Sequence, residues 1–208
     1  MEFNDLVKAE EKLGRAYINW NLEKNDAYRD LLYSYGYVNY KQGRIQLDQE
    51  KLERALGFWN QLLNDQQITH SESVEFALSL TYLGLERYDL AEAFIDESIQ
   101  DITPDLDYFQ KSRGEVPDRV LERVKMLSDN YNNLGVVQVS KALSERQRNR
   151  YINKQKAIEH FIDSITLKDE LNLLKGVPYA NFNRINNFPQ VQEDFFLSDG
   201  SLPKTLLP

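Results

Sequence analysis

The sequence predicts an all-α protein, and three observations lead to that prediction. Apolar residues recur every three or four positions through most of residues 1–171, which is the period of one helix face. Alternation of apolar and polar residues, the pattern of a half-buried strand, is not evident. Hydrophobic residues make up 41% of the 208 residues and aromatic residues 12%, which is enough to fill a core. We therefore expect a globular chain of packed helices.

Three helices are expected in the first third of the chain, each with one apolar face. The faces comprise Leu6, Leu13, Tyr17 and Trp20 in the first, Leu31, Leu32, Tyr35 and Val38 in the second, and Leu52, Leu56, Trp59, Leu62 and Leu63 in the third. Residues 1–25 form a unit of their own, either a cap or a half-repeat.

A fourth and a fifth helix are expected to form an antiparallel pair. Thr69 and Glu72 have the spacing of a capping box, so the fourth helix is predicted to begin near Ser71. Helical spacing resumes at Tyr88 after an interruption at Gly84. The two helices are therefore predicted to be joined by a very short turn.

The second half of the chain is expected to hold a connection, two long helices and a tail. Residues 102–117 contain two prolines and a glycine, so they are predicted to be a connection with at most one short helical piece. Pro117 is suited to a first helical turn, and the next helix is predicted to run to about Leu143. Another is expected from about Asn153 to Leu171, followed by an extended tail at residues 172–208.

Three of the expected helix pairs share a spacing of small and large residues. The third reads Tyr131-x2-Leu134-Gly135 followed by Ala157-x3-Phe161, the second Leu78-Ser79-x2-Tyr82 followed by Ala91 and Ile95, and the first Leu32-x2-Tyr35-Gly36 followed by Ala55-x3-Trp59. This spacing resembles the tetratricopeptide repeat (TPR) family. In such repeats the small residues let two helices approach closely, and the large residues fill the space between neighbouring pairs.

The resemblance implies a right-handed α-solenoid of three TPR-like pairs within residues 26–171, at about 28–66, 71–101 and 117–171. An irregular helical bundle that uses the same small residues for close packing is the alternative. The first and third copies carry insertions of about seven and ten residues relative to the middle one. These insertions either lengthen the helices beyond their partners or lengthen the turns.

Three stretches are similar to the TPR regions of spirochaetal flagellar collar proteins. They are Asn130-Tyr-Asn-Asn-Leu-Gly-Val136, Lys154-Gln-Lys-Ala-Ile-Glu-His160 and Pro178-Tyr-Ala-Asn-Phe182. This similarity implies a structural subunit of a large assembly, such as a component of a bacterial flagellar motor. The expected compartment is the cytoplasm by default, or the periplasm if the chain is a fragment of an exported flagellar protein.

Residue counts and motifs argue against an enzyme. The chain has no cysteine and two histidines, which excludes thiol chemistry and makes a transition-metal site improbable. No Gly-rich phosphate loop, nucleophile elbow or zinc-protease motif occurs in the sequence. His70 and His160 are interpreted as surface or boundary residues. We therefore expect no catalytic residue, no metal and no cofactor.

Binding of a protein or peptide partner is the expected function, because stacked helix pairs form a concave face. The TPR positions that line this face select three tyrosines in the first copy, apolar residues in the second, and asparagines and valines in the third. The predicted groove residues are Tyr33, Tyr37, Tyr40, Phe76, Leu80, Leu83, Asn132, Asn133, Val136 and Val139. The tyrosines share one helical stripe. They either contact a ligand or cover the first helix as part of its core.

Two further segments are candidates for contacts. The insertion at 141–156 is basic in an acidic chain, and it either binds an acidic partner or neighbouring subunit or is a solvated helix overhang. Its basic residues are Lys141, Arg146, Arg148, Arg150, Lys154 and Lys156. The tail carries Tyr179, Phe182, Ile185, Phe188, Phe195 and Phe196. We expect these residues to dock on the repeats, with Asn181, Asn183, Asn186 and Asn187 turned outward.

Charge and hydropathy limit the remaining partners. The formal net charge of −8 repels phosphate backbones, so a nucleic-acid partner is not expected. No stretch reaches the roughly 18 apolar residues of a membrane span, and the first residues lack the layout of a signal peptide. The pattern leaves self-association open, and the abrupt C-terminus suggests a piece of a longer chain.

Overall fold

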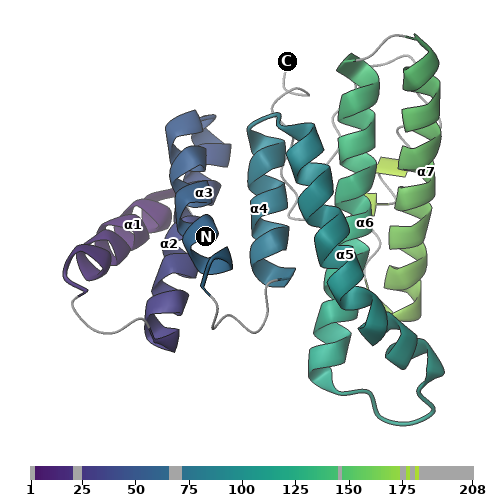
Figure 1. Cartoon of the computed structure of the whole chain (residues 1–208), viewed down its shortest axis with the longest axis horizontal. Helices are drawn as coiled ribbons and strands as arrows, with labels where there is room; N and C mark the ends of the chain where they lie inside the picture. Colours follow the sequence, from purple (N-terminus) through teal and green to yellow (C-terminus); the bar gives the residue numbers. More distant parts are fainter. Residues whose placement is uncertain are drawn as a thin grey trace.

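The computed structural model describes residues 3–20, 25–65, 72–144, 147–173, 177–178 and 181–182. Within these ranges the regular elements are all α-helices, so the predicted all-α class is confirmed (Figure 1). The helices are α1 (Phe3–Ile18), α2 (Asp26–Gln46), α3 (Gln49–Leu63), α4 (Glu72–Gly84), α5 (Tyr88–Lys111), α6 (Asp118–Ser144) and α7 (Gln147–Glu170).

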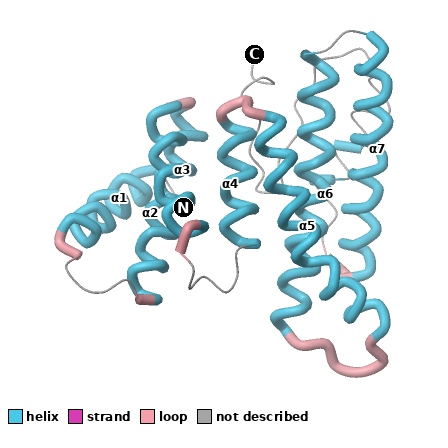
Figure 2. The backbone as a smooth tube through the Cα atoms, in the orientation of Figure 1, coloured by secondary structure: helices cyan, strands magenta, loops and turns pink. Residues whose placement is uncertain are grey.

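The six helices from α2 onward pack as consecutive hairpins, and α1 packs against the first of them. The hairpins are α2 with α3, α4 with α5, and α6 with α7. Neighbouring hairpins meet where α3 contacts α4 and where α5 contacts α6. Their first helices also touch, α2 with α4 and α4 with α6. Figure 2 shows the resulting row, in which α4 lies between the first and the third hairpin.

Side-chain caps fix where the first hairpin begins and turns. The Asn25 Oδ1 accepts from the Tyr28 N–H at 3.1 Å, which satisfies a donor that the start of α2 leaves open. The Asp48 carboxylate accepts from the Glu50 N–H at 2.9 Å and so caps α3. Between the two helices Leu47 adopts a left-handed conformation with φ 56°. The turn therefore needs only residues 47 and 48.

The insertions in the first and third copies lengthen helices rather than turns. The long α2 reaches Gln46 before its two-residue turn. In the third hairpin α6 reaches Ser144 and α7 already begins at Gln147. The last helix thus starts earlier than the expected position near Asn153, because the inserted residues extend it by more than one turn. The predicted fourth helix begins at Glu72, one residue after the expected start.

The expected connection at residues 102–117 is wrong over most of its length. α5 continues through Pro104 to Lys111, although proline removes one helical hydrogen bond. Tertiary contacts hold this part of the helix in place. Ile102 is fully buried, and Arg123 of α6 donates to the Asp101 carbonyl at 2.6 Å and pairs with Asp105 at 2.9 Å. The connection is therefore reduced to residues 112–117.

One large apolar core runs through the three hairpins, and a smaller one lies at the far end of α5, α6 and α7. The large core includes residues of every helix from α2 to α7. The smaller one is built from Ile102, Val124, Leu127 and Leu167. In the part of the chain that the structure describes, no helix is both long and apolar enough to cross a membrane.

Candidate interaction surface

The predicted contact between a small and a large residue is present in the first and the third hairpin. An added Cβ at Gly36 would lie within 3.0 Å of the Trp59 ring, and one at Gly135 would lie within 3.0 Å of the Phe161 ring. Both aromatic side chains are fully buried. In the middle hairpin Ser79 takes the small position, and it too is fully buried. The first and the third hairpin therefore bring their helices together through equivalent positions, and the small residue at the corresponding position of the second is buried.

The three alanines predicted at the other small position are also completely buried. They are Ala55, Ala91 and Ala157. A residue without side-chain bulk beyond Cβ lets the second helix of a pair lie close to the first. This close approach fixes which face of α2, α4 and α6 turns away from the second helices.

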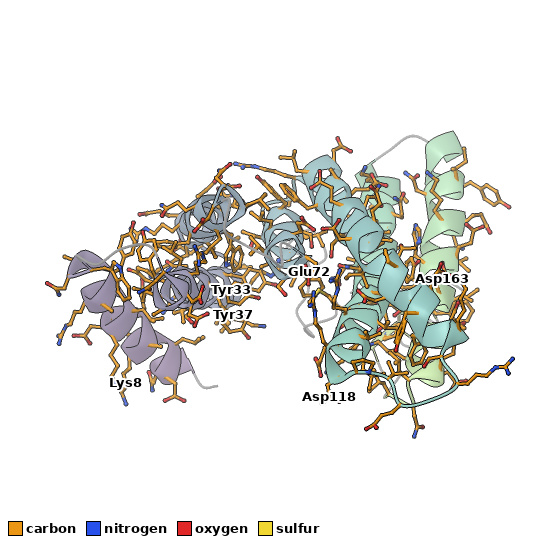
Figure 3. The ribbon with its side chains drawn as sticks, turned by 60° about the horizontal axis from the view of Figure 1, so that its bottom comes forward. Lys8, Tyr33, Tyr37, Glu72, Asp118 and Asp163 are labelled. Atoms are coloured by element: carbon orange, nitrogen blue, oxygen red, sulfur yellow. The ribbon has the colours of Figure 1, made fainter. Side chains whose placement is uncertain are left out.

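The predicted tyrosine stripe of α2 is divided between the core and the surface. Tyr40 is 1% exposed, and its ring centroid lies 5.9 Å from that of Trp59. Tyr33 and Tyr37 are 36% and 39% exposed, and Figure 3 shows them side by side along α2. Burial, with a contribution from Tyr37, raises the pKa of Tyr33. The Tyr33 hydroxyl therefore stays protonated at neutral pH and can donate a hydrogen bond.

Two basic residues follow the tyrosines on α2. The Lys41 Nζ lies 5.5 Å from the Tyr37 ring centroid and 5.6 Å from that of Tyr40, within the range of a cation–π contact. The half-buried Arg44 is one turn further on and lies against Gly84 of α4. We call Tyr33, Tyr37, Lys41 and Arg44 the α2 stripe. Arg44 was not among the predicted groove residues, although its helical spacing from Tyr33 and Tyr37 could have suggested it.

The predicted groove residues of α4 and α6 are less accessible than those of α2. Phe76 is half-buried, and the remaining ones are buried: Leu80, Leu83, Asn132, Asn133, Val136 and Val139. The predicted groove positions therefore fall into two groups. Tyr33 and Tyr37 of α2 are partly exposed, whereas the others are buried apart from the half-buried Phe76.

The described part of the tail contacts α6 at one of these buried positions. The Asn181 Nδ2 donates to the Asn132 Oδ1 at 3.1 Å, and both residues are buried. Phe182 packs against the large core and Pro178 is buried. The expectation that Asn181 turns outward is wrong, because its amide is used in this contact. Asn183, Asn186, Asn187, Tyr179, Ile185, Phe188, Phe195 and Phe196 lie outside the described residues.

The basic segment at 141–156 is only partly described, and one of its residues forms ion pairs within the fold. The Lys141 Nζ pairs with Asp89 at 2.6 Å and also with Glu92, both on α5. Lys154 is half-buried and Lys156 is exposed. The side chains of Arg146, Arg148 and Arg150 lie outside the described residues. Next to these positions Tyr151 and Ile152 are exposed. Neither was predicted as a contact residue, because a single apolar pair carries no periodic signal.

Titratable groups gather where α5, α6 and α7 meet. Burial lowers the pKa of His160 against the opposing effect of nearby acids, of which Asp163 contributes most. Burial raises the pKa values of Asp96 and Asp163. The His160 ring stacks on Tyr131 at 6.4 Å between centroids. Among the described side chains no group of three His, Cys, Asp or Glu is placed to hold a metal ion, and His70 lies outside the described ranges.

Comparison with known proteins gives no match to a family model, to a curated protein or to a solved structure.

Proposed function

We propose that this chain is a non-enzymatic protein-interaction module, a TPR-like right-handed solenoid of three helix pairs that binds a partner peptide or helix. The equivalent close contacts in the first and third hairpins, with the burial of Ser79 at the same position of the second, support the repeat architecture. The side-by-side contacts of α2, α4 and α6 support a shared face on their side of the molecule. A partner would bind at the α2 end of that face.

The observation that carries this proposal is the exposure of Tyr33 and Tyr37 on a helix whose other side is rigidly packed. Each phenol offers apolar area and a hydroxyl, and it loses little conformational entropy when it is covered. Each ring has a close neighbour, since the Tyr33 centroid lies 6.4 Å from that of Trp59 and the Tyr37 centroid lies 5.5 Å from the Lys41 Nζ. Rigid aromatic anchors of this kind account for most of the binding energy in many interfaces.

The test compares the double variant Tyr33→Ser/Tyr37→Ser with the wild-type chain. Capture from the source organism would identify the partner, and titration with that purified partner would give the affinity. We expect about thirtyfold weaker binding, which corresponds to about 2 kcal/mol for the loss of aromatic anchors. Tyr108→Ser is the matched control, because Tyr108 is an exposed tyrosine on α5. Equal affinities for the stripe variant and the control would reject the proposal.

A structural role in a large assembly is the second proposal, and the exposed face of α7 favours it. Tyr151 is 66% exposed, and Ile152 and Ile162 are exposed as well. Lys156 is exposed on the same helix. The hydrogen bond between Asn181 and Asn132 supports this role too, because the tail then covers part of the predicted groove.

The assembly role predicts that substitution of exposed residues on α7, rather than of the α2 stripe, impairs function. The variant Tyr151→Ser/Ile152→Ser should leave the free energy of unfolding within about 0.5 kcal/mol of wild type, since both side chains are exposed. It should also reduce the size of complexes that native mass spectrometry or sedimentation detects. Unchanged complexes in this variant would exclude α7 as the contact surface.

A further inference from the structure

The half-buried Arg44 lies at the end of the α2 stripe, beside Gly84 of α4. A larger residue at position 84 would crowd the arginine side chain. An added Cβ at Gly84 would lie 3.1 Å from Arg44 Cδ and 3.2 Å from its Nη1. The missing side chain of Gly84 thus leaves room for the guanidinium. The Arg44 Nε is buried and has no hydrogen-bond partner. Among the described residues no carboxylate is paired with Arg44.

The surroundings of Arg44 define what it would bind. A partly buried guanidinium is stabilised best by a carboxylate, which it can engage through two parallel hydrogen bonds. Lys41 lies one turn away and adds a second positive charge beside the Tyr37 ring. Tyr37 and Tyr33 then provide aromatic area along the same stripe. A ligand with acidic residues next to large apolar ones matches this order of groups.

The tail of this chain contains such a segment. Residues 193–196 read Glu-Asp-Phe-Phe, which places two carboxylates directly before two aromatic rings. The tail is already fixed at α6 by the hydrogen bond between Asn181 and Asn132 and by the packing of Phe182.

The chain between the anchored residues and this segment is long enough. Glu193 lies eleven positions after Phe182, and eleven positions span up to about 36 Å when the chain is extended. Crossing from α6 over α4 to α2 takes two interhelical spacings, about 20 Å in all. Arg44 lies eleven positions beyond Tyr33, the α2 counterpart of Asn132, which adds about 16 Å along the helix. The direct distance is therefore about 26 Å, well within reach.

We propose that residues 193–196 dock on the α2 stripe of the same molecule, with the Glu193 or Asp194 carboxylate on Arg44 and the Phe195 and Phe196 rings against Tyr37. This inference rests on the proposed function in one respect, because it uses the same stripe that binds the partner. The tail then competes with the partner, and a partner must present a similar acidic and aromatic segment to displace it.

The test is site-specific photo-crosslinking in the full-length chain, with benzoylphenylalanine in place of Tyr37. Irradiation of monomeric protein followed by peptide mass spectrometry should give a crosslink to the peptide that contains residues 193–196. Glu193→Gln/Asp194→Asn in the same chain should reduce its yield about tenfold, because the charged hydrogen bonds to Arg44 are lost. Arg44→Gln should reduce it similarly in a chain whose helicity by circular dichroism is unchanged. Benzoylphenylalanine at Tyr108 of α5 is the control and should not react with this peptide.

Three results would overturn the inference. They are a Tyr37 probe that reacts without touching residues 193–196, a yield that does not change in Glu193→Gln/Asp194→Asn, and crosslinks that join two isotopically distinct copies. The last result would assign the stripe to a second copy of the chain. None of these measurements uses a partner, so an unchanged partner affinity in Tyr33→Ser/Tyr37→Ser would reject the proposed function alone.

Discussion

The first and the third hairpin use the same internal contact and present different surfaces. In each, a glycine on the first helix lies against a fully buried aromatic ring on the second, Gly36 with Trp59 and Gly135 with Phe161. At the equivalent outward position, however, α2 carries the partly exposed Tyr33 and α6 carries the buried Asn132. The two positions differ in what covers them, since Asn181 of the tail forms a hydrogen bond with Asn132 of α6.

This difference shows that repeat spacing sets the packing within a pair but leaves the accessibility of its outer face open. Burial of an amide requires hydrogen-bond partners, and Asn132 obtains one from the tail. A phenol can stay partly exposed without such a requirement. Positions that are buried within the fold therefore differ from equivalent positions that stay partly exposed.

The largest expected effect comes from deleting the buried aromatic ring of either hairpin. Trp59→Ala and Phe161→Ala should each lower the free energy of unfolding by about 3–5 kcal/mol, because a large buried ring leaves a cavity. Urea denaturation followed by circular dichroism measures this. Tyr151→Ala removes an exposed ring and should change the value by less than about 0.5 kcal/mol. Clearly unequal losses for Trp59→Ala and Phe161→Ala would contradict the equivalence of the two rings, and a similar loss for Tyr151→Ala would show that burial is not the cause.

Asn132→Ala should separate the covered hairpin from the open one. The substitution leaves the buried Asn181 Nδ2 without the Asn132 acceptor, and we expect a loss of about 1–3 kcal/mol. Tyr33→Ala, at the equivalent position of the open hairpin, should have a smaller effect on stability. A double-mutant cycle with Asn181→Ala should show positive coupling; additive losses would mean that the two amides do not depend on each other.

Gly135→Ala should lower the free energy of unfolding by a smaller amount. Whether the substitution destabilises or stabilises the protein tests the close contact between Gly135 and Phe161. The new methyl group would overlap the Phe161 ring, which costs about 1–3 kcal/mol, whereas replacing a helical glycine gains about 1 kcal/mol. A net loss of up to about 2 kcal/mol is expected. Gly57→Ala is the matched control, because a Cβ there meets nothing within 4 Å, and it should stabilise α3. Stabilisation by both substitutions would mean that the close contact is absent.

The smallest effect is a pH dependence of stability at His160. Burial lowers its folded-state pKa below the ordinary value of 6.5, so the unfolded chain takes up the proton first as the pH falls. Stability should therefore decrease as the pH falls from 6.5 through the lowered pKa. The raised pKa values of Asp96 and Asp163 act in the opposite sense at lower pH, where stability decreases as the pH rises above 3.8.

Urea titrations of wild type and His160→Gln at a series of pH values test this dependence. The difference between the two proteins should shrink as the pH falls through the histidine range, because only the wild type loses stability there through histidine protonation. Parallel curves for the two proteins would show that His160 does not contribute.

Sequence periodicity was sufficient to predict the helices wherever local signals and packing agree. The start of α4 beside Glu72 and the short turn before Tyr88 follow from a capping signal and an interrupted period. The prediction of a connection around Pro104 was wrong. Proline disfavours a helix interior, but the burial of Ile102 and the contacts of Arg123 stabilise the helix there. Such contacts join residues about twenty positions apart, and no local pattern reveals them.

The sequence by itself determined the all-α class and the pairing of small with large residues, because both depend on spacings along one helix or between neighbouring helices. The tertiary structure alone decided that Tyr40 is core while Tyr33 and Tyr37 are partly exposed. It also decided that Asn181 returns to Asn132 across 49 positions. Exposure depends on which distant segment covers a face, and that is a property of the packed chain rather than of the face itself.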